Sequence, residues 1–103
     1  LEYNKDKISH KLAELLLPLA GAEVYASTPA DQRAQKSIQV IRQLRDVLNE
    51  RTKLPRTLKE TGKVTEAQLD EIAAKALDDG SIIFNPREAS INDLKAVLKK
   101  AWA

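Results

Sequence analysis

One histidine, two adjacent aspartates and one serine are the residues of this sequence that first suggest chemistry. His10 is the only histidine, and Glu14 follows it by four residues, a spacing that places both side chains on one face of a helix. A transition-metal site usually needs three or more convergent ligands, and the sequence has no cysteine to supply one. We therefore predict that His10 is a surface residue on a helix and not a metal ligand.

Asp78, Asp79 and Ser81 surround Gly80, where a helix is expected to end. The helix dipole disfavours negative charge at a C-terminus, so the two aspartates could mark a contact with a cation or a partner. We favour the simpler interpretation that they are solvated turn residues. Ser81 has no histidine or lysine close by in the sequence to activate it as a nucleophile. Glycine is also too scarce, at 3 residues, for a phosphate-binding loop.

An apolar run at residues 82–84 precedes Asn85-Pro86-Arg87. Apolar patches in loops are usually buried against something else. The proline fixes its own φ and disfavours helix at Asn85, so Arg87 leaves the loop in a defined direction. We predict that this loop packs against more protein than a small helical bundle requires.

Four segments with apolar residues at helical spacing must position these side chains. The first helix is expected to begin after Asn4, with Tyr3 and Ile8 as a hydrophobic staple. Its apolar stripe contains Pro18, which should kink or end the helix before Gly21 closes it.

The later helices are predicted from their capping signals. Thr28 should be the N-cap of a second helix that runs to about Glu50. Capping boxes are expected at Thr65 with Gln68 and at Ser90 with Asp93, and they start the third and the last helix. No second run of alternating apolar residues exists from which a sheet could be built. The predicted fold class is all-α, a small bundle of four main helices plus a short turn at residues 56–62.

Length and composition favour one domain over residues 1–103. The hydrophobic fraction of 43% and the charged fraction of 31% are typical of a globular chain of a size that closes one core. No apolar run is long enough to span a membrane, and the lack of cysteine slightly favours the cytoplasm. The basic stretch at residues 42–63 has no aromatic residue for base stacking, so we expect a solvated helix end and no nucleic-acid partner.

Several motifs resemble the C-terminal end of the iron-containing alcohol dehydrogenase family, in particular its lactaldehyde-reductase-like members. The Asn-Pro-Arg element before a final helix that ends in Ala101-Trp102 is the most specific of them. Residues 1–4 also look like the stretch that follows the family's last metal ligand. The other matching motifs are Leu54-Pro55-Arg56-Thr57-Leu58, the stretch from Thr65 to Ala73, and Ala76-Leu77-Asp78-Asp79.

The resemblance implies an enzyme that oxidises alcohols or reduces aldehydes and ketones with NAD or NADP and a divalent metal, iron or zinc. It implies that the nucleotide-binding domain and the metal ligands, one aspartate and three histidines, lie upstream of Leu1. This chain would then be a C-terminal fragment without catalytic residues, metal site or cofactor site of its own. The loop at 80–84 would approach the substrate, which makes Ser81, Ile83 and Phe84 candidate pocket-lining residues.

The expected partners are the remainder of the parent enzyme and further copies of the protein in a homo-oligomer, because the isolated helices would expose apolar surface. An alternative is an independent protein-interaction module that binds a partner helix along residues 12–19 or 94–101. A nucleic-acid binder that uses residues 42–63 ranks last. Relatives tend to have a cysteine near Ser81 and small residues near Phe84, so the resemblance leaves the substrate open.

Overall fold

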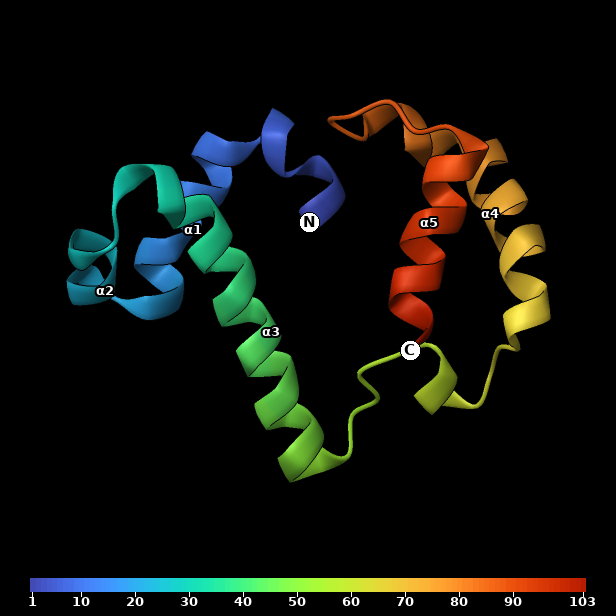
Figure 1. Cartoon of the computed structure of the whole chain (residues 1–103), viewed down its shortest axis with the longest axis horizontal. Helices are drawn as coiled ribbons and strands as arrows, with labels where there is room; N and C mark the ends of the chain where they lie inside the picture. Colours follow the sequence, from blue (N-terminus) through green and yellow to red (C-terminus); the bar gives the residue numbers. More distant parts are fainter. The chain divides into compact units, whose positions relative to one another are not determined.

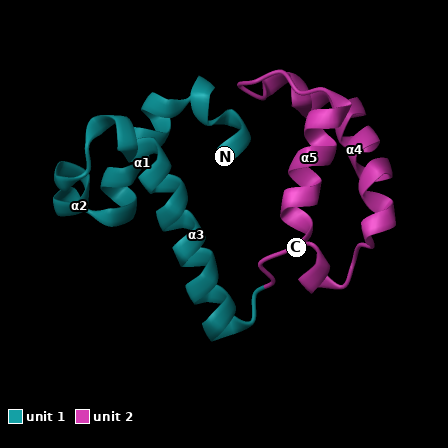
Figure 2. Cartoon of the chain, in the orientation of Figure 1, with its two compact units in different colours: residues 1–54 teal, residues 55–103 magenta.

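The computed structural model describes all 103 residues and contains helices but no strands (Figure 1). The predicted all-α fold class is thereby confirmed. The chain divides into two compact units, Leu1–Leu54 and Pro55–Ala103 (Figure 2). That residues 1–103 belong to one domain stays a prediction, because two compact units can be parts of one domain in a larger protein. None of the helices combines the length and the apolar character that crossing a membrane requires.

The first unit begins differently from what its sequence predicts. Residues Glu2–Lys7 form a 3-10 helix, η1, and the first α-helix, α1, spans Ser9–Ala20. The predicted start after Asn4, with a staple between Tyr3 and Ile8, is therefore wrong. Ile8 sits at the junction with φ −128° and packs against the core of the unit. This burial gives Ile8 a tertiary contact in place of the local one that a staple would make.

The end of α1 and the start of α3 show how local signals compete. Helix α1 continues through Pro18 and closes at Gly21, whose φ of +90° is unfavourable for any other residue. A short helix that we did not predict, α2 (Ala22–Ser27), follows. Thr28 is not an N-cap, because its hydroxyl donates a 2.6 Å hydrogen bond back to the Val24 carbonyl at the end of α2. A 3-10 turn, η2 (Ala30–Gln32), then leads into α3, which spans Arg33–Thr52.

The core of the first unit lies between α1 and α3. Leu12 and Leu16 are buried at 1% and 0% exposure, and they come from successive turns of α1. On α3 the buried residues are Ala34, Ser37 and Ile38, two of which are small enough to let the helices approach closely. The buried Ser37 hydroxyl donates a 2.6 Å hydrogen bond to the Leu12 carbonyl. The seam between α1 and α3, which we define by these buried residues, therefore contains no buried polar side chain without a hydrogen-bond partner.

The second unit follows the predicted capping signals. Both capping boxes are present: Gln68 Oε1 accepts from Thr65 N at 2.9 Å, and Asp93 Oδ2 accepts from Ser90 N at 2.9 Å. The box at Thr65 starts η4 (Glu66–Gln68), which leads directly into α4 (Leu69–Asp78). The box at Ser90 starts α5 (Ile91–Trp102). The predicted short turn contains the 3-10 helix η3 (Lys59–Thr61), and a last 3-10 helix, η5, spans Gly80–Phe84.

Helices α4 and α5 pack against each other, and few contacts hold the rest of the unit. Leu69 and Ala73 of α4 are buried, and Lys95 of α5 forms a 3.2 Å ion pair with Asp70. The Leu58 N–H donates a 2.8 Å hydrogen bond to the Ala101 carbonyl, which ties the turn before η3 to the end of α5.

Replacing Leu12 by alanine tests the seam between α1 and α3. We expect the free energy of unfolding of the chain to fall by about 2–5 kcal/mol, because the substitution leaves a cavity between two helices. Urea denaturation followed by far-UV circular dichroism measures the change. The matched control is Leu17→Ala on the same helix, where the side chain is 47% exposed and the loss should stay below about 1 kcal/mol. Equal losses for both variants would show that the seam is not the core.

Candidate functional site

The candidate site lies at the tip of the second unit, where α4 ends and η5 begins. Asp79 is the N-cap of η5, and its Oδ1 accepts hydrogen bonds from Ser81 N at 2.8 Å and from Ser81 Oγ at 2.6 Å. Asp79, which with Asp78 was predicted to be a solvated turn residue, is therefore exposed and also caps η5. Aspartate is a preferred N-cap residue because its carboxylate accepts from the unpaired amides of the first turn.

The same contacts change the acidity of the carboxyl group. The Ser81 hydroxyl, and after it the Ser81 amide, lower the pKa of Asp79 from its ordinary value of 3.8, because both donate to the ionised form. The group is fully exposed, so burial opposes the shift only slightly. A lowered folded-state pKa means that the cap stabilises the fold above pH 3.8 and that this contribution is lost as the pH falls through the folded-state value.

Ile83 and Phe84 point away from the unit, with 76% and 82% of their surface exposed. They are the two most exposed large apolar side chains of the chain. The prediction that the apolar residues 82–84 lie in a loop is wrong, because residues 80–84 form a 3-10 helix. The prediction that this segment packs against further protein stays a prediction. Within this chain, most of each side chain is left uncovered.

A hollow of about 320 Å³ lies beside η5. Its lining includes one of the three residues predicted to line a pocket, Ile83, but neither Ser81 nor Phe84. The side chains that the sequence analysis did not propose for a site come from α4, η5 and the segment before α5. They are Leu77, Ile82, Asn85, Glu88 and Ala89.

No sequence signal marked these lining residues as a group. Leu77 keeps the apolar helical period of α4, yet 37% of it is exposed. Asn85 did carry a signal, because the following proline disfavours helix there. The structure shows Asn85 with extended φ and ψ at the end of η5, and its side-chain amide donates to the Arg87 carbonyl. This turn directs the chain back past the hollow.

The other candidates for chemistry lie apart from this tip. His10 is exposed on α1, as predicted. No group of three or more histidine, cysteine, aspartate or glutamate side chains is close enough together to hold a metal ion. The chain's own residues therefore do not fit a metal, and we assign no catalytic step to them.

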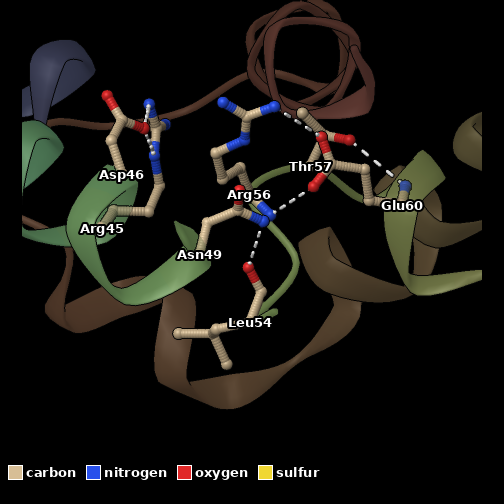
Figure 3. A network of polar contacts seen from close by, with 7 residues as sticks. All are labelled: Arg45, Asp46, Asn49, Leu54, Arg56, Thr57 and Glu60. Carbon is tan, nitrogen blue, oxygen red and sulfur yellow. Dashed lines mark hydrogen bonds and ion pairs between the residues drawn. The ribbon is translucent and has the colours of Figure 1, made fainter. Parts of the chain in front are cut away.

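The basic stretch forms local pairs on both sides of Leu54 (Figure 3). In the first unit Arg45 pairs with Asp46 at 2.9 Å, and the Asn49 amide donates to the Leu54 carbonyl at 2.9 Å. In the second unit the Arg56 guanidinium lies 3.4 Å from Glu60. These pairs are exposed and contribute little to stability. These exposed pairs agree with the prediction that the basic stretch at residues 42–63 is a solvated helix end and loop.

Comparison with known proteins identifies the chain at the level of a family. The family model "Fe-containing alcohol dehydrogenase family, C-terminal" matches residues 1–102. The search of curated proteins found no match, and neither did the search of solved structures.

The cap at Asp79 can be tested by titration. We expect NMR titration of the chain to give an Asp79 pKa below 3.8, and Ser81→Ala to raise it, because the serine hydroxyl is the main cause of the shift. Ser27→Ala is the matched control, since that exposed serine bonds only to the Val24 carbonyl, and it should leave the Asp79 pKa unchanged. An Asp79 pKa that Ser81→Ala does not move would contradict the cap.

Proposed function

This chain belongs to the Fe-containing alcohol dehydrogenase family, and we propose that it forms the helical C-terminal part of an enzyme that interconverts alcohols with aldehydes or ketones. The match of the family model over residues 1–102 is the observation that carries this proposal. The all-helical fold supports it. We further propose that the enzyme is lactaldehyde-reductase-like, on the resemblance of its motifs to those members of the family. Ser81 and Phe84 depart from the cysteine and the small residues that such relatives tend to have near these positions.

The cofactors of the whole enzyme are, in this proposal, NAD or NADP and a divalent metal, iron or zinc. The metal supplies the Lewis acidity that polarises a carbonyl oxygen when it is bound. Because this chain has no cluster of metal ligands, we assign metal and dinucleotide binding to other parts of the parent protein. The chain by itself is then not catalytic, and its role is to shape the site.

The tip at η5 is the part of this chain that we assign to the substrate pocket. It exposes Ile83 and Phe84, and Ser81 is held by the Asp79 cap. A short 3-10 helix with a capped start holds its side chains in fixed directions, which a pocket wall requires. The exposure of the two apolar side chains supports this assignment, since large apolar groups left in water usually mark a binding site or an interface.

A second uncovered surface lies on the C-terminal half of α3. Leu44, Val47 and Leu48 are 52%, 40% and 37% exposed there. We propose that the remainder of the parent enzyme covers this α3 surface, and that the enzyme is a cytoplasmic homo-oligomer. The alternative of an independent interaction module has less of its first surface available, because Leu12 is already buried against α3 and Leu16 is buried within the unit.

Enzyme activity tests the proposed function. The purified parent protein should reduce short aldehydes with NADH or NADPH, lose this activity when a chelator removes the metal, and regain it with ferrous iron or zinc. Residues 1–103 alone, assayed in parallel, should show no turnover. Activity that survives complete metal removal, or turnover by the isolated chain, would contradict the proposal.

Thiol labelling tests whether the α3 surface is covered in the parent enzyme. The chain contains no cysteine, so Leu44→Cys introduces the only thiol of residues 1–103. We expect a maleimide to label Cys at this position at least about tenfold more slowly in the parent protein than in the isolated chain, since burial blocks access to the thiol. Gln43→Cys, an exposed polar neighbour, is the control and should label alike in both. Equal rates at position 44 would leave the surface uncovered and refute its assignment to an interface.

A further inference from the structure

Another hollow lies on the first unit, where α2 ends and α3 begins. It has a volume of about 480 Å³, and a proline is the only apolar residue of its lining. An apolar molecule in this hollow would cover polar groups without returning a hydrogen bond to them, which costs free energy. The hollow therefore suits a polar ligand. The polar side chains of its lining are Ser27, Thr28, Gln32, Gln35, Lys36 and Gln39.

Lys36 gives this hollow a single positive charge. The lining contains no carboxylate that could neutralise the ammonium group, and Lys36 takes part in none of the ion pairs of the chain. One ammonium group can pair with one negative charge, whereas a dianion would place its second charge among neutral side chains without a partner. The charge of the lining therefore fits a ligand with one negative charge.

The hydrogen bonds that the neutral side chains already make define what they can offer a ligand. The Ser27 and Thr28 hydroxyls both donate to the Val24 carbonyl, at 3.3 and 2.6 Å, so their oxygens are left as acceptors. Gln35 Oε1 accepts from Lys5 Nζ at 3.0 Å, so the NH2 group of Gln35 is left to donate. A lining that offers both acceptors and donors matches hydroxyl groups, because each hydroxyl donates and accepts.

Arg33 holds the two sides of the hollow together. Its Nε donates to the Tyr25 carbonyl at 3.1 Å and to the Thr28 carbonyl at 3.0 Å. Its guanidinium carbon also lies 4.0 Å from the centroid of the Tyr25 ring. These contacts fix the end of α2 and the segment after it to the first residue of α3. A ligand would thus meet polar groups that are already ordered, which lowers the entropic cost of binding.

From this lining we propose that the hollow binds a small polyhydroxylated monoanion, namely a sugar acid. Its carboxylate would pair with Lys36, and its hydroxyl groups would bond to the side chains of Ser27, Thr28 and Gln35. The volume falls within the range of small-molecule sites and accommodates an acid of the size of gluconate. The proposal uses only residues of the first unit and does not depend on the enzymatic activity proposed above.

NMR titration of the full 103-residue chain with sodium gluconate tests the proposal. We expect gluconate to shift the backbone amide signals of residues 27–39. Its affinity should be at least about tenfold higher than that of hexanoate, which has the charge without the hydroxyls, and that of sorbitol, which has the hydroxyls without the charge. Absence of gluconate shifts, or an affinity for hexanoate or sorbitol equal to that for gluconate, would overturn the proposal.

Substitutions separate binding in the hollow from attraction to the net charge of the chain. Lys36→Gln should lower the affinity for gluconate at least about tenfold, because it removes the charge-assisted hydrogen bond. Lys100→Gln, on exposed α5, removes the same charge elsewhere and should leave the affinity unchanged. Gln35→Leu keeps the Lys36 charge and should weaken the binding of gluconate but not that of hexanoate. Equal losses in the two lysine variants, or unchanged gluconate binding in Gln35→Leu, would refute the assignment.

Discussion

The packing of Leu12 against Ala34 and Ile38 of α3 is the interaction on which the first unit depends. Leu12 and Leu16 of α1 are almost fully buried, and each contributes roughly 1.5–3 kcal/mol by its burial. The small side chains of Ala34 and Ser37 on α3 allow the two helices to approach closely. The serine is acceptable there because its hydroxyl finds the Leu12 carbonyl at 2.6 Å. The short elements η1 and α2 are arranged around this seam.

The second unit relies on a different kind of constraint. Only Leu69 and Ala73 are buried, so the unit has a thin core. Its helices instead start at hydrogen-bonded caps, two of them reciprocal between residues three apart. Caps are local interactions, and they fix where a helix begins without help from distant residues. The tip that carries the candidate site is thus defined mainly by its own sequence.

This contrast explains what the sequence could predict. The capping boxes at Thr65 and Ser90 were found because all their groups lie within four residues. The predicted staple at Tyr3 is wrong because Ile8, which is partly buried, packs against the core of the unit instead. The predicted cap at Thr28 is wrong because the Thr28 hydroxyl donates to the Val24 carbonyl of α2, a helix that was not predicted. The sequence predicted the segment that carries the candidate site but not its hollow. Its segment follows from the apolar run at 82–84, whereas the hollow depends on how Leu77 and Ala89 meet in space.

Asp79 shows how one residue can resolve a conflict between neighbouring elements. A carboxylate at the end of α4 lies at the negative end of the helix dipole, which is unfavourable. The same carboxylate stands at the start of η5, where the Ser81 amide and the Ser81 hydroxyl both donate to it, and these two hydrogen bonds lower the pKa of Asp79. The charge therefore stabilises the abrupt change from α4 to η5. Ile83 and Phe84, which follow in η5, remain 76% and 82% exposed. The Asp79 cap thus defines where α4 ends and where η5 begins, and η5 is the segment that carries the two most exposed large apolar side chains of the chain.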